Sequence, residues 1–360
     1  MNTRFNAILG CLAALMMIAC NENKQGTPGT TSTSAATAGT EATLVIVSYG
    51  GAYQKAQHDG FFAQFSRDHH VRIVEQEWSG DIARLKAMVE SGNVTWDVVD
   101  AEDYIVPRAA DENLLERLSP SVTAGLNIPP GATTEYGAAV CYWSTVLGYN
   151  TKLLQGKQPP SGWKDFFDTK RYPGPRSLRK SPVSTLEVAL LADGVAPASL
   201  YPLDVDRAFR ALDRIKPSVS VWWEAGEQPA QLLASGEVAM SSIWNGRAYN
   251  AAKAGKPVAF TWNGGLLSSD WWIVPRGSKN KALAEEFIRF ATTAPAQAEF
   301  AKHIPYGPIN SDAFALLSPE IKTDLPTAPD NFSKQQALRR DWWNAHEAEL
   351  TKRFNDWLLK

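Results

Sequence analysis

Three apolar runs stand close together in the chain: TLVIV at residues 43–47, VRIV at 71–74 and WDVV at 96–99. Continuous runs rich in β-branched residues are typical of strands that are covered on both faces. Apolar residues at helical spacing fill the two intervals between the runs. This alternation predicts an open, mostly parallel sheet of the α/β class. Because such sheets bind ligands beyond the carboxyl ends of their strands, the segments of interest are 48–53 and 100–104.

A second series of strand and helix signals follows. Residues 176–180 read as a strand, and Ser184 and Glu187 form a capping box that opens a helix. Further strands are expected over 219–224, 238–244, 258–262 and 270–274, and helices over 205–215, 228–234, 247–255 and around Leu283, Phe287 and Phe290. Two α/β lobes are the simplest description, with a crossing near 140–146 and a return near 263–270.

The composition excludes several classes of protein. The 360 residues carry 36 Lys and Arg against 38 Asp and Glu, and 44% of them are hydrophobic. This balance argues against disorder and against a general nucleic-acid binder, which needs an excess of basic residues. At about 150 residues a domain, the length fits two domains. Five His and three Cys leave little material for a metal site, so we expect neither a metal nor a cofactor.

The N-terminus has the features of an export signal. Residues 1–19 join a short basic start to an apolar run that is too short for a membrane span of about 20 residues. The run ends Met17-Ile18-Ala19-Cys20, which resembles the lipobox of bacterial lipoproteins and makes Cys20 the lipidated residue. Met17 fits that pattern weakly, so cleavage without lipidation is the alternative. Residues 20–42, dense in Thr, Ser, Ala and Gly, predict a flexible tether that holds an exported domain at the cell envelope or in the periplasm.

Sequence motifs for catalysis are missing. The chain has no Cys-x-x-Cys, no Gly-x-Ser-x-Gly, no phosphate loop and no Gly-x-Gly-x-x-Gly. His346-Glu347 lacks the second His that a zinc protease helix requires. Cys141 stands alone in an apolar setting and is interpreted as a buried small hydrophobe. These observations favour a binding protein over an enzyme.

Three motifs carry a family resemblance: Ile243-Trp244-Asn245-Gly246, then Gly264-Gly265 six residues before Asp270, then Ile304-Pro305-Tyr306-Gly307-Pro308-Ile309-Asn310. In these motifs and in the order of its elements, the chain resembles the spermidine/putrescine-binding family, the substrate-binding components of bacterial ABC importers. The resemblance implies a two-lobed type II periplasmic-binding fold with a two-stranded hinge and a ligand cleft between the lobes. It also implies C-terminal helices that return to the second lobe, and an ABC permease of the inner membrane as partner.

The resemblance gives the expected lobes and the expected site. Lobe 1 should comprise residues 43–141 and 264–310, and lobe 2 residues 142–263 and 311–360. Matched position by position, the family's ligand-binding residues fall on Tyr49, Tyr53, Glu102 or Asp103, Trp244, Asp270 and Tyr306. An alkylammonium ligand needs a carboxylate for its charge and aromatic faces for its methylenes, and this set supplies both. Taken singly, Trp244 could be a core residue and Asp270 a turn residue.

Two departures from the family bear on the ligand. Ser268 stands where the family has a Trp, and residues 179–184 are basic and hydroxylic where the polyamine binders are acidic. Lys180 and Ser181, with the helix start that follows, could bind an anion. The ligand would then be an ω-amino acid such as γ-aminobutyrate, because Lys180 would repel the second ammonium of a diamine. Lys180 could equally be a solvated surface charge.

The acidic residues at 100–103 admit two interpretations. They could bind an amine or a cation, or they could cap the helix that follows and complement its dipole. We favour the cap, with Asp103 the residue best placed to do both.

The sequence therefore predicts a binding protein that captures a small amine-bearing solute, either a polyamine or an ω-amino acid. A carbohydrate-binding lipoprotein of the same broad fold is the alternative, because exposed Trp faces also stack on sugars. An adhesin or structural lipoprotein without a small ligand is a third possibility.

Overall fold

The computed structural model describes residues 42–360. The predicted leader, Cys20 and all but the last residue of the predicted tether lie outside this part of the chain. None of the helices within residues 42–360 is long and apolar enough to span a membrane.

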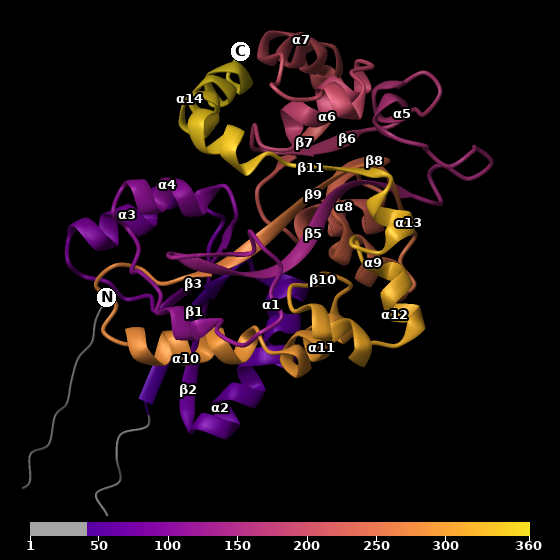
Figure 1. Ribbon diagram of the computed structural model, residues 1–360. Coiled ribbons are helices and arrows are strands. Elements are labelled where there is room, and N and C mark those ends of the chain that lie inside the picture. The colour runs from indigo at the N-terminus through magenta and orange to yellow at the C-terminus, as the bar shows by residue number, and fades with distance from the viewer. Residues whose placement is uncertain (1–41) are drawn as a thin grey trace, which may run out of the picture. The chain divides into compact units, whose positions relative to one another are not determined.

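Strands and helices alternate through the described residues (Figure 1). The strands are β1 (Ala42–Ser48), β2 (Val71–Glu77), β3 (Val98–Glu102), β4 (Thr133–Thr134), β5 (Gly137–Asn150), β6 (Arg176–Arg179), β7 (Val219–Trp223), β8 (Met240–Trp244), β9 (Val258–Ile273), β10 (Gly307–Pro308) and β11 (Gln335–Ala337). The helices are α1 (Gly51–Gln57), α2 (Ala63–His69), α3 (Ile82–Glu90), α4 (Ile105–Asp111), α5 (Trp163–Phe167), α6 (Thr185–Ala192), α7 (Val205–Ile215), α8 (Gln228–Ser235), α9 (Asn245–Lys253), α10 (Lys281–Ala291), α11 (Ala294–His303), α12 (Pro319–Asp324), α13 (Pro329–Phe332) and α14 (Arg340–Leu358). One π-helical turn (His58–Phe62) joins α1 to α2.

The described strands form one 11-stranded sheet in the order β2-β1-β3-β9-β5-β8-β6-β7, with β4 and β10 on β5 and β11 on β9. The two long antiparallel strands β5 and β9 lie at its centre and run between the two halves of the molecule (Figure 1). Strand β3 pairs with the end of β9, and β8 pairs with residues 145–149 of β5. The predicted strands at 258–262 and 270–274 are therefore parts of one strand, β9.

The half that carries β2, β1 and β3 confirms the predicted α/β beginning. β1 pairs in parallel with both β2 and β3. Leu44 and Ile46 of β1 are fully buried, as the continuous apolar run predicted. The predicted helix runs through Phe61, Phe62 and Phe65, which are buried, and Phe61 and Phe62 pack against Trp272 of β9.

The half that carries β8, β6 and β7 is covered by α6, α7 and the C-terminal helix α14 (Figure 1). Trp357 of α14 packs against Phe209 of α7 and Trp222 of β7. The indole of Trp343 in α14 donates to Glu187 of α6 at 2.7 Å. The C-terminal helix thus packs on this half, in line with the implied return to the second lobe. The exact lobe boundaries stay a prediction.

The start of α6 corrects the predicted capping box. Ser184 precedes the helix, but its φ is +68° and its hydroxyl makes no capping hydrogen bond. That hydroxyl instead accepts a hydrogen bond from Thr145 at 3.4 Å. Glu187, the other residue of the box, is fully buried and accepts hydrogen bonds from Tyr201 and Trp343. The tertiary partners of both side chains therefore replace the local cap.

Candidate ligand-binding site

A small cavity lies where β1, β3 and β8 end, at the side of β5 and β9. Its volume is only about 10 Å³, and it is lined by Tyr49, Tyr53, Glu102, Trp143, Trp244, Arg247, Asp270 and Tyr306. A cavity needs about 10–15 Å³ on this measure to hold a single water molecule. The side chains therefore nearly close the cavity, and a ligand enters it only when they move apart.

The cavity brings together five of the eight residues predicted to bind ligand: Tyr49, Tyr53, Trp244, Asp270 and Tyr306. Tyr49 and Tyr53 come from the end of β1 and the start of α1, and Trp244 ends β8. Trp244 lies far from the two tyrosines in the sequence, and it meets them because strand ends converge at this edge of the sheet.

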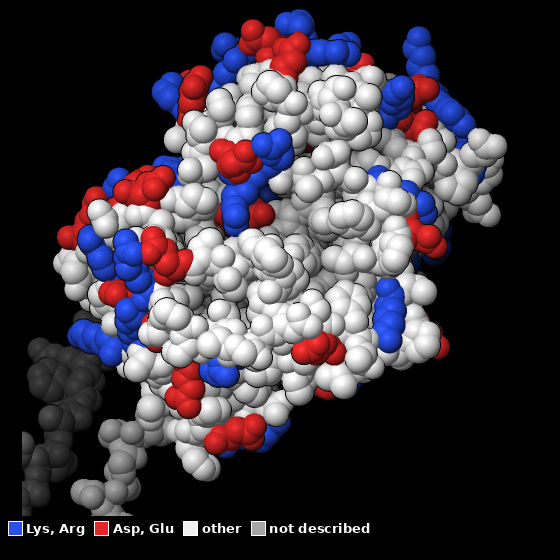
Figure 2. Space-filling model, viewed as in Figure 1, with Lys and Arg blue, Asp and Glu red and all other residues white. Residues whose placement is uncertain are grey.

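Lys180, Ser181 and Asp103 do not line the cavity. Lys180 is exposed and forms an ion pair with Glu224 at 2.9 Å, and the hydroxyl of Ser181 accepts from the backbone of Val183. Lys180 and Ser181 instead line a wider groove outside the cavity, together with Arg108, Arg179, Trp223, Glu224 and Glu347 among others; we call it the outer groove. Figure 2 shows this face hollowed between its upper and lower parts, with basic and acidic groups at the edge.

The acidic residues at 100–103 contact other side chains, so the helix-cap interpretation is wrong. Tyr104 occupies the position before α4, and no side chain caps that helix. Asp103 accepts hydrogen bonds from the hydroxyls of Ser268 and Ser269, both at 3.2 Å. Ser268, which stands where the family has a Trp, is thus a hydrogen-bond partner of Asp103.

Asp270 supplies a buried negative charge to the cavity. Its carboxylate accepts a hydrogen bond from the indole of Trp143 at 2.8 Å. Antiparallel pairing places Glu102 of β3 opposite Asp270 of β9. Burial raises the pKa of Asp270 well above its ordinary value of 3.8, and the nearby charges of Asp100 and Glu102 raise it further. The ionised form of a carboxylate that is buried beside other acidic groups is stabilised most by a nearby cation.

Asp100 lies just behind this group. Its Oδ2 accepts from Ser48 at 3.1 Å and from Gln57 at 2.6 Å, while its Oδ1 has no hydrogen-bond partner. Burial raises the pKa of Asp100 to about 7, although the hydrogen bonds that it accepts oppose the change. Asp100, Glu102 and Asp270 therefore give this end of the cavity an excess of acidic groups.

Arg247 supplies the positive charge, and sequence reasoning did not find it. Its Nε lies 3.2 Å from Glu227, and its Nη1 donates to the hydroxyl of Tyr306 at 3.3 Å. Its Nη2 lies 3.4 Å from the carbonyl oxygen of Tyr49, and its Cζ lies 4.7 Å from the ring centroid of Trp244. Arg247 directly follows the Trp-Asn-Gly motif in α9, and that adjacency was the available signal.

Glycines let these groups approach one another. A Cβ on Gly226 would lie 2.4 Å from the ring of Trp244. Gly51 has a φ of +58°, and a Cβ there would lie 2.0 Å from Glu227, which accepts a hydrogen bond from the backbone N–H of Ala52 at 2.7 Å. Larger residues would push Glu227 away from Arg247.

Asn245 joins two of the family motifs in the structure, the one at 243–246 and the one at 304–310. Its side-chain oxygen accepts from the backbone N–H of Ser144 in β5 at 2.9 Å, and its amide donates to the carbonyl of Pro305 at 2.9 Å. This residue therefore ties the end of β8 to the segment that presents Tyr306.

A second arginine lies beside the cavity. Arg179, at the end of β6, pairs with Glu102 at 2.7 Å, and their side chains are 10% and 1% exposed. The Cζ of Arg179 lies 5.2 Å from the ring centroid of Trp244. The basic character that the sequence showed at 179–184 thus reaches the site through Arg179, while Lys180 points to its exposed partner Glu224.

Comparison with known proteins places the chain in a family. The model for bacterial extracellular solute-binding proteins matches residues 27–328. A γ-aminobutyric acid-binding protein of Pseudomonas aeruginosa is 43% identical over 324 residues, covering 88% of this chain and 91% of the relative. A spermidine/putrescine-binding periplasmic protein of Escherichia coli K12 is 25% identical, covering 75% of this chain and 80% of the relative.

The fold agrees with the same family. The solved structure of a γ-aminobutyric acid receptor, Atu4243, superposes with a TM-score of 0.78 at 37% identity, covering 88% of this chain and 97% of that one. The chain belongs to the bacterial extracellular solute-binding proteins, the family that includes the γ-aminobutyrate-binding and the spermidine/putrescine-binding proteins.

Proposed function

We propose that this protein is the substrate-binding component of an ABC importer and that its ligand is a short ω-amino acid such as γ-aminobutyrate. One observation carries the proposal: a single small cavity is lined by both a buried carboxylate, Asp270, and a buried guanidinium, Arg247. A ligand with an ammonium at one end and a carboxylate at the other matches both charges.

The ammonium end of the ligand contacts Asp270 and the aromatic side chains around it. A buried cation needs an opposite charge, because an unpaired one is very costly to desolvate. Tyr49, Trp143 and Trp244 surround the same space, with Trp143 and Trp244 in edge contact at 5.6 Å between ring centroids. Aromatic faces add about 1–2 kcal/mol to a desolvated cation.

The carboxylate end of the ligand binds Arg247. The planar guanidinium offers donors in a fixed fork that suits a carboxylate. A diamine would place its second ammonium against this arginine, and a neutral sugar would offer no opposite charge to Asp270 or to Arg247. The proposal therefore favours an ω-amino acid over the polyamines and over the carbohydrate alternative.

Capture brings the two lobes together. Tyr49, Glu102 and Asp270 fall in predicted lobe 1, and Trp244 and Arg247 fall in predicted lobe 2. A ligand held by both sets favours the closed form through its greater affinity for that form. The closed form would be the one that an inner-membrane permease recognises, with ATP hydrolysis on another subunit and no catalysis by this chain.

The proposed setting is the periplasmic side of the envelope. The family is extracellular by description, and the predicted lipidation of Cys20 would hold the domain at a membrane through its tether. Mass spectrometry of the mature protein from a native membrane would detect the acyl group on Cys20.

Four ligands of equal chain length test the function by isothermal titration calorimetry. They are γ-aminobutyrate, putrescine, butyrate and n-butylamine, with maltose as the uncharged comparison. We expect tight binding of γ-aminobutyrate, with at least about a hundredfold loss when either charged end is removed or replaced, because Asp270 or Arg247 then loses a charged, hydrogen-bonding contact inside the cavity. Equal or better binding of putrescine would overturn the ω-amino acid assignment, and binding of maltose alone would overturn the ligand class.

A further inference from the structure

We infer that the buried ion pair Glu102–Arg179 forms the end wall of the ligand cavity and sets the longest ligand that the protein accepts. The inference rests on the proposed function and adds a specificity-determining element to it. The end wall is defined as the side chains of these two residues, which lie 2.7 Å apart.

The pair stands between two separate spaces. Glu102, at the end of β3, lines the small cavity, whereas Arg179, at the end of β6, lines the outer groove. The two spaces share no lining residue. The small cavity has a volume of about 10 Å³ and the outer groove about 500 Å³. Removal of the pair would therefore join a restrictive space to a roomy one.

Two indole rings continue the same partition. Trp244 lines the cavity and Trp223 lines the outer groove, and their ring centroids are 5.4 Å apart in edge contact. The Cζ of Arg179 lies 5.2 Å from the Trp244 centroid and 5.9 Å from that of Trp223. Arg179 thus packs against both rings as well as pairing with Glu102, so its loss would leave a gap that neither ring fills.

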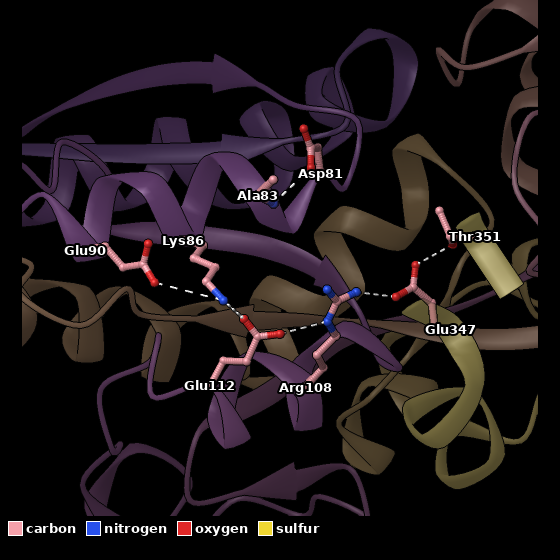
Figure 3. Close-up of polar contacts among 8 residues, drawn as sticks. All are labelled: Asp81, Ala83, Lys86, Glu90, Arg108, Glu112, Glu347 and Thr351. Atoms are coloured by element: carbon pink, nitrogen blue, oxygen red, sulfur yellow. Dashed lines mark hydrogen bonds and ion pairs between the residues drawn. The ribbon is translucent and has the colours of Figure 1, made fainter. Parts of the chain in front are cut away.

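Charged groups beyond the wall keep the outer groove wet and polar. Arg108 of α4 lies between Glu112 and Glu347 of α14, and Thr351 donates to Glu347 at 2.8 Å (Figure 3). Lys180 and Glu224 pair in the same groove. A longer ω-amino acid that passed the wall would extend into this solvated groove without meeting a second apolar barrier.

The wall joins the two lobes without a ligand. Glu102 falls in predicted lobe 1 and Arg179 in predicted lobe 2, and the Glu102 side chain is 1% exposed. The pair is therefore part of the closed structure, and a ligand too long for the cavity must displace a buried ion pair before the lobes can close. Removing one partner alone would leave an unpaired buried charge, so the test removes both together.

The test compares ligand-length profiles by calorimetry. The wild type and the double variant Glu102→Ala/Arg179→Ala are titrated with ω-amino acids from 4-aminobutyrate to 8-aminooctanoate. We expect wild-type affinity to fall steeply once the chain exceeds the cavity. In the double variant, affinity should stay level with length, or change by less than the roughly fourfold that burying a methylene would give, because the added chain extends into the solvated outer groove.

Two further double variants separate a wall from a general structural role. Lys180→Ala/Glu224→Ala removes an exposed ion pair from the outer groove and should keep the wild-type profile. Glu102→Gln/Arg179→Met removes the charges but keeps most of the volume, and should also keep the wild-type length limit. Should the Ala/Ala protein not fold, Glu102→Gln/Arg179→Ala carries the same expectation of relaxed length.

The outcomes are distinct. A wild type that binds γ-aminobutyrate, with the same length profile in the wall variant, would overturn the inference and leave the proposed function standing. The inference would also be overturned, with the proposed function left standing, if the Lys180→Ala/Glu224→Ala control accepted longer ligands to the same extent as the wall variant. A wild type that binds no ω-amino acid would overturn the proposed function and the inference with it.

Discussion

Asp270→Asn should abolish most ligand binding while leaving the fold in place. The change removes one charge and keeps the size of the side chain. Its remaining oxygen can still accept the hydrogen bond that Trp143 donates at 2.8 Å. Burial and the charges of Asp100 and Glu102 disfavour the ionised carboxylate, so loss of the charge should not destabilise the unliganded protein.

The magnitude follows from the burial of this group. Asp270 is 5% exposed, and truncating one partner of a buried, hydrogen-bonded charge pair costs about 2–5 kcal/mol. At 1.4 kcal/mol for each factor of ten, the Kd for γ-aminobutyrate should rise by about 30-fold to several thousandfold. Calorimetry measures this Kd, and pH 8 is preferred because Asp270 is closer to full ionisation there than at neutral pH.

Asp103→Asn is the matched control. Asp103 is also a partly buried carboxylate at the end of β3, but its partners are Ser268 and Ser269 and it does not line the cavity. Its Kd should stay within about threefold of the wild type. If Asp270→Asn keeps wild-type affinity, or if both variants lose it equally, the assignment of Asp270 to the ligand ammonium is refuted.

Three further predictions concern pH, stability and release. Affinity for γ-aminobutyrate should increase by up to tenfold per pH unit as pH rises through the raised pKa of Asp270, because the ammonium binds the ionised carboxylate. Calorimetry from pH 5 to 9 measures this dependence, and a flat profile would contradict the prediction. Burial raises the pKa of Glu187 from 4.5 to about 7, so the folded state holds this proton to higher pH than the unfolded state, and stability falls as pH rises between these values. Glu187→Gln should reduce this pH-dependent loss of the free energy of unfolding by about 3 kcal/mol. Urea unfolding at pH 5 and at pH 8 measures the difference, and a variant with the pH dependence of the wild type would disprove the prediction. Arg108→Gln breaks the contact with Glu347 of α14 and should speed ligand release several-fold in stopped-flow measurements, since that contact joins α4 to α14. The control Arg353→Gln loses the ion pair with Asp206 and the contact with the Phe209 ring, both of which lie in α7, and should release ligand at the wild-type rate.

Much of the fold could be predicted because its signals are local. The run at 43–47 consists of residues that favour a strand buried on both faces, and it forms β1. The motif at 243–246 and the segment at 304–310 meet because Asn245 bonds to Pro305. Tyr49 and Trp244 follow or end strands at the same edge of the sheet, and the antiparallel strand β9 brings Asp270 to the same place, so the three line one cavity.

The charged parts of the site could not be predicted because their partners are distant in sequence. Arg179 was part of a basic stretch, but only the pairing of its side chain with Glu102 takes it inward, while its neighbour Lys180 faces Glu224. Successive residues at a strand end point to opposite sides, and the prediction named Lys180 rather than its neighbour Arg179, which is the one that faces the site. Glu187 fitted a local capping rule and was taken instead by Tyr201 and Trp343.

The crossing of β5 and β9 has a consequence for how reproducible closure is. The ladder between them has register shifts between Ala139 and Cys141 and between Thr145 and Leu147, and such irregularities bend a strand more easily than its regular parts. Shear along the strands would break the whole ladder of hydrogen bonds, whereas bending distorts only the irregular positions. If the predicted lobes close by bending at these two places, we expect each closure to bring Asp270 and Arg247 back to the same separation, so that the span between the two charges selects the length of the ligand.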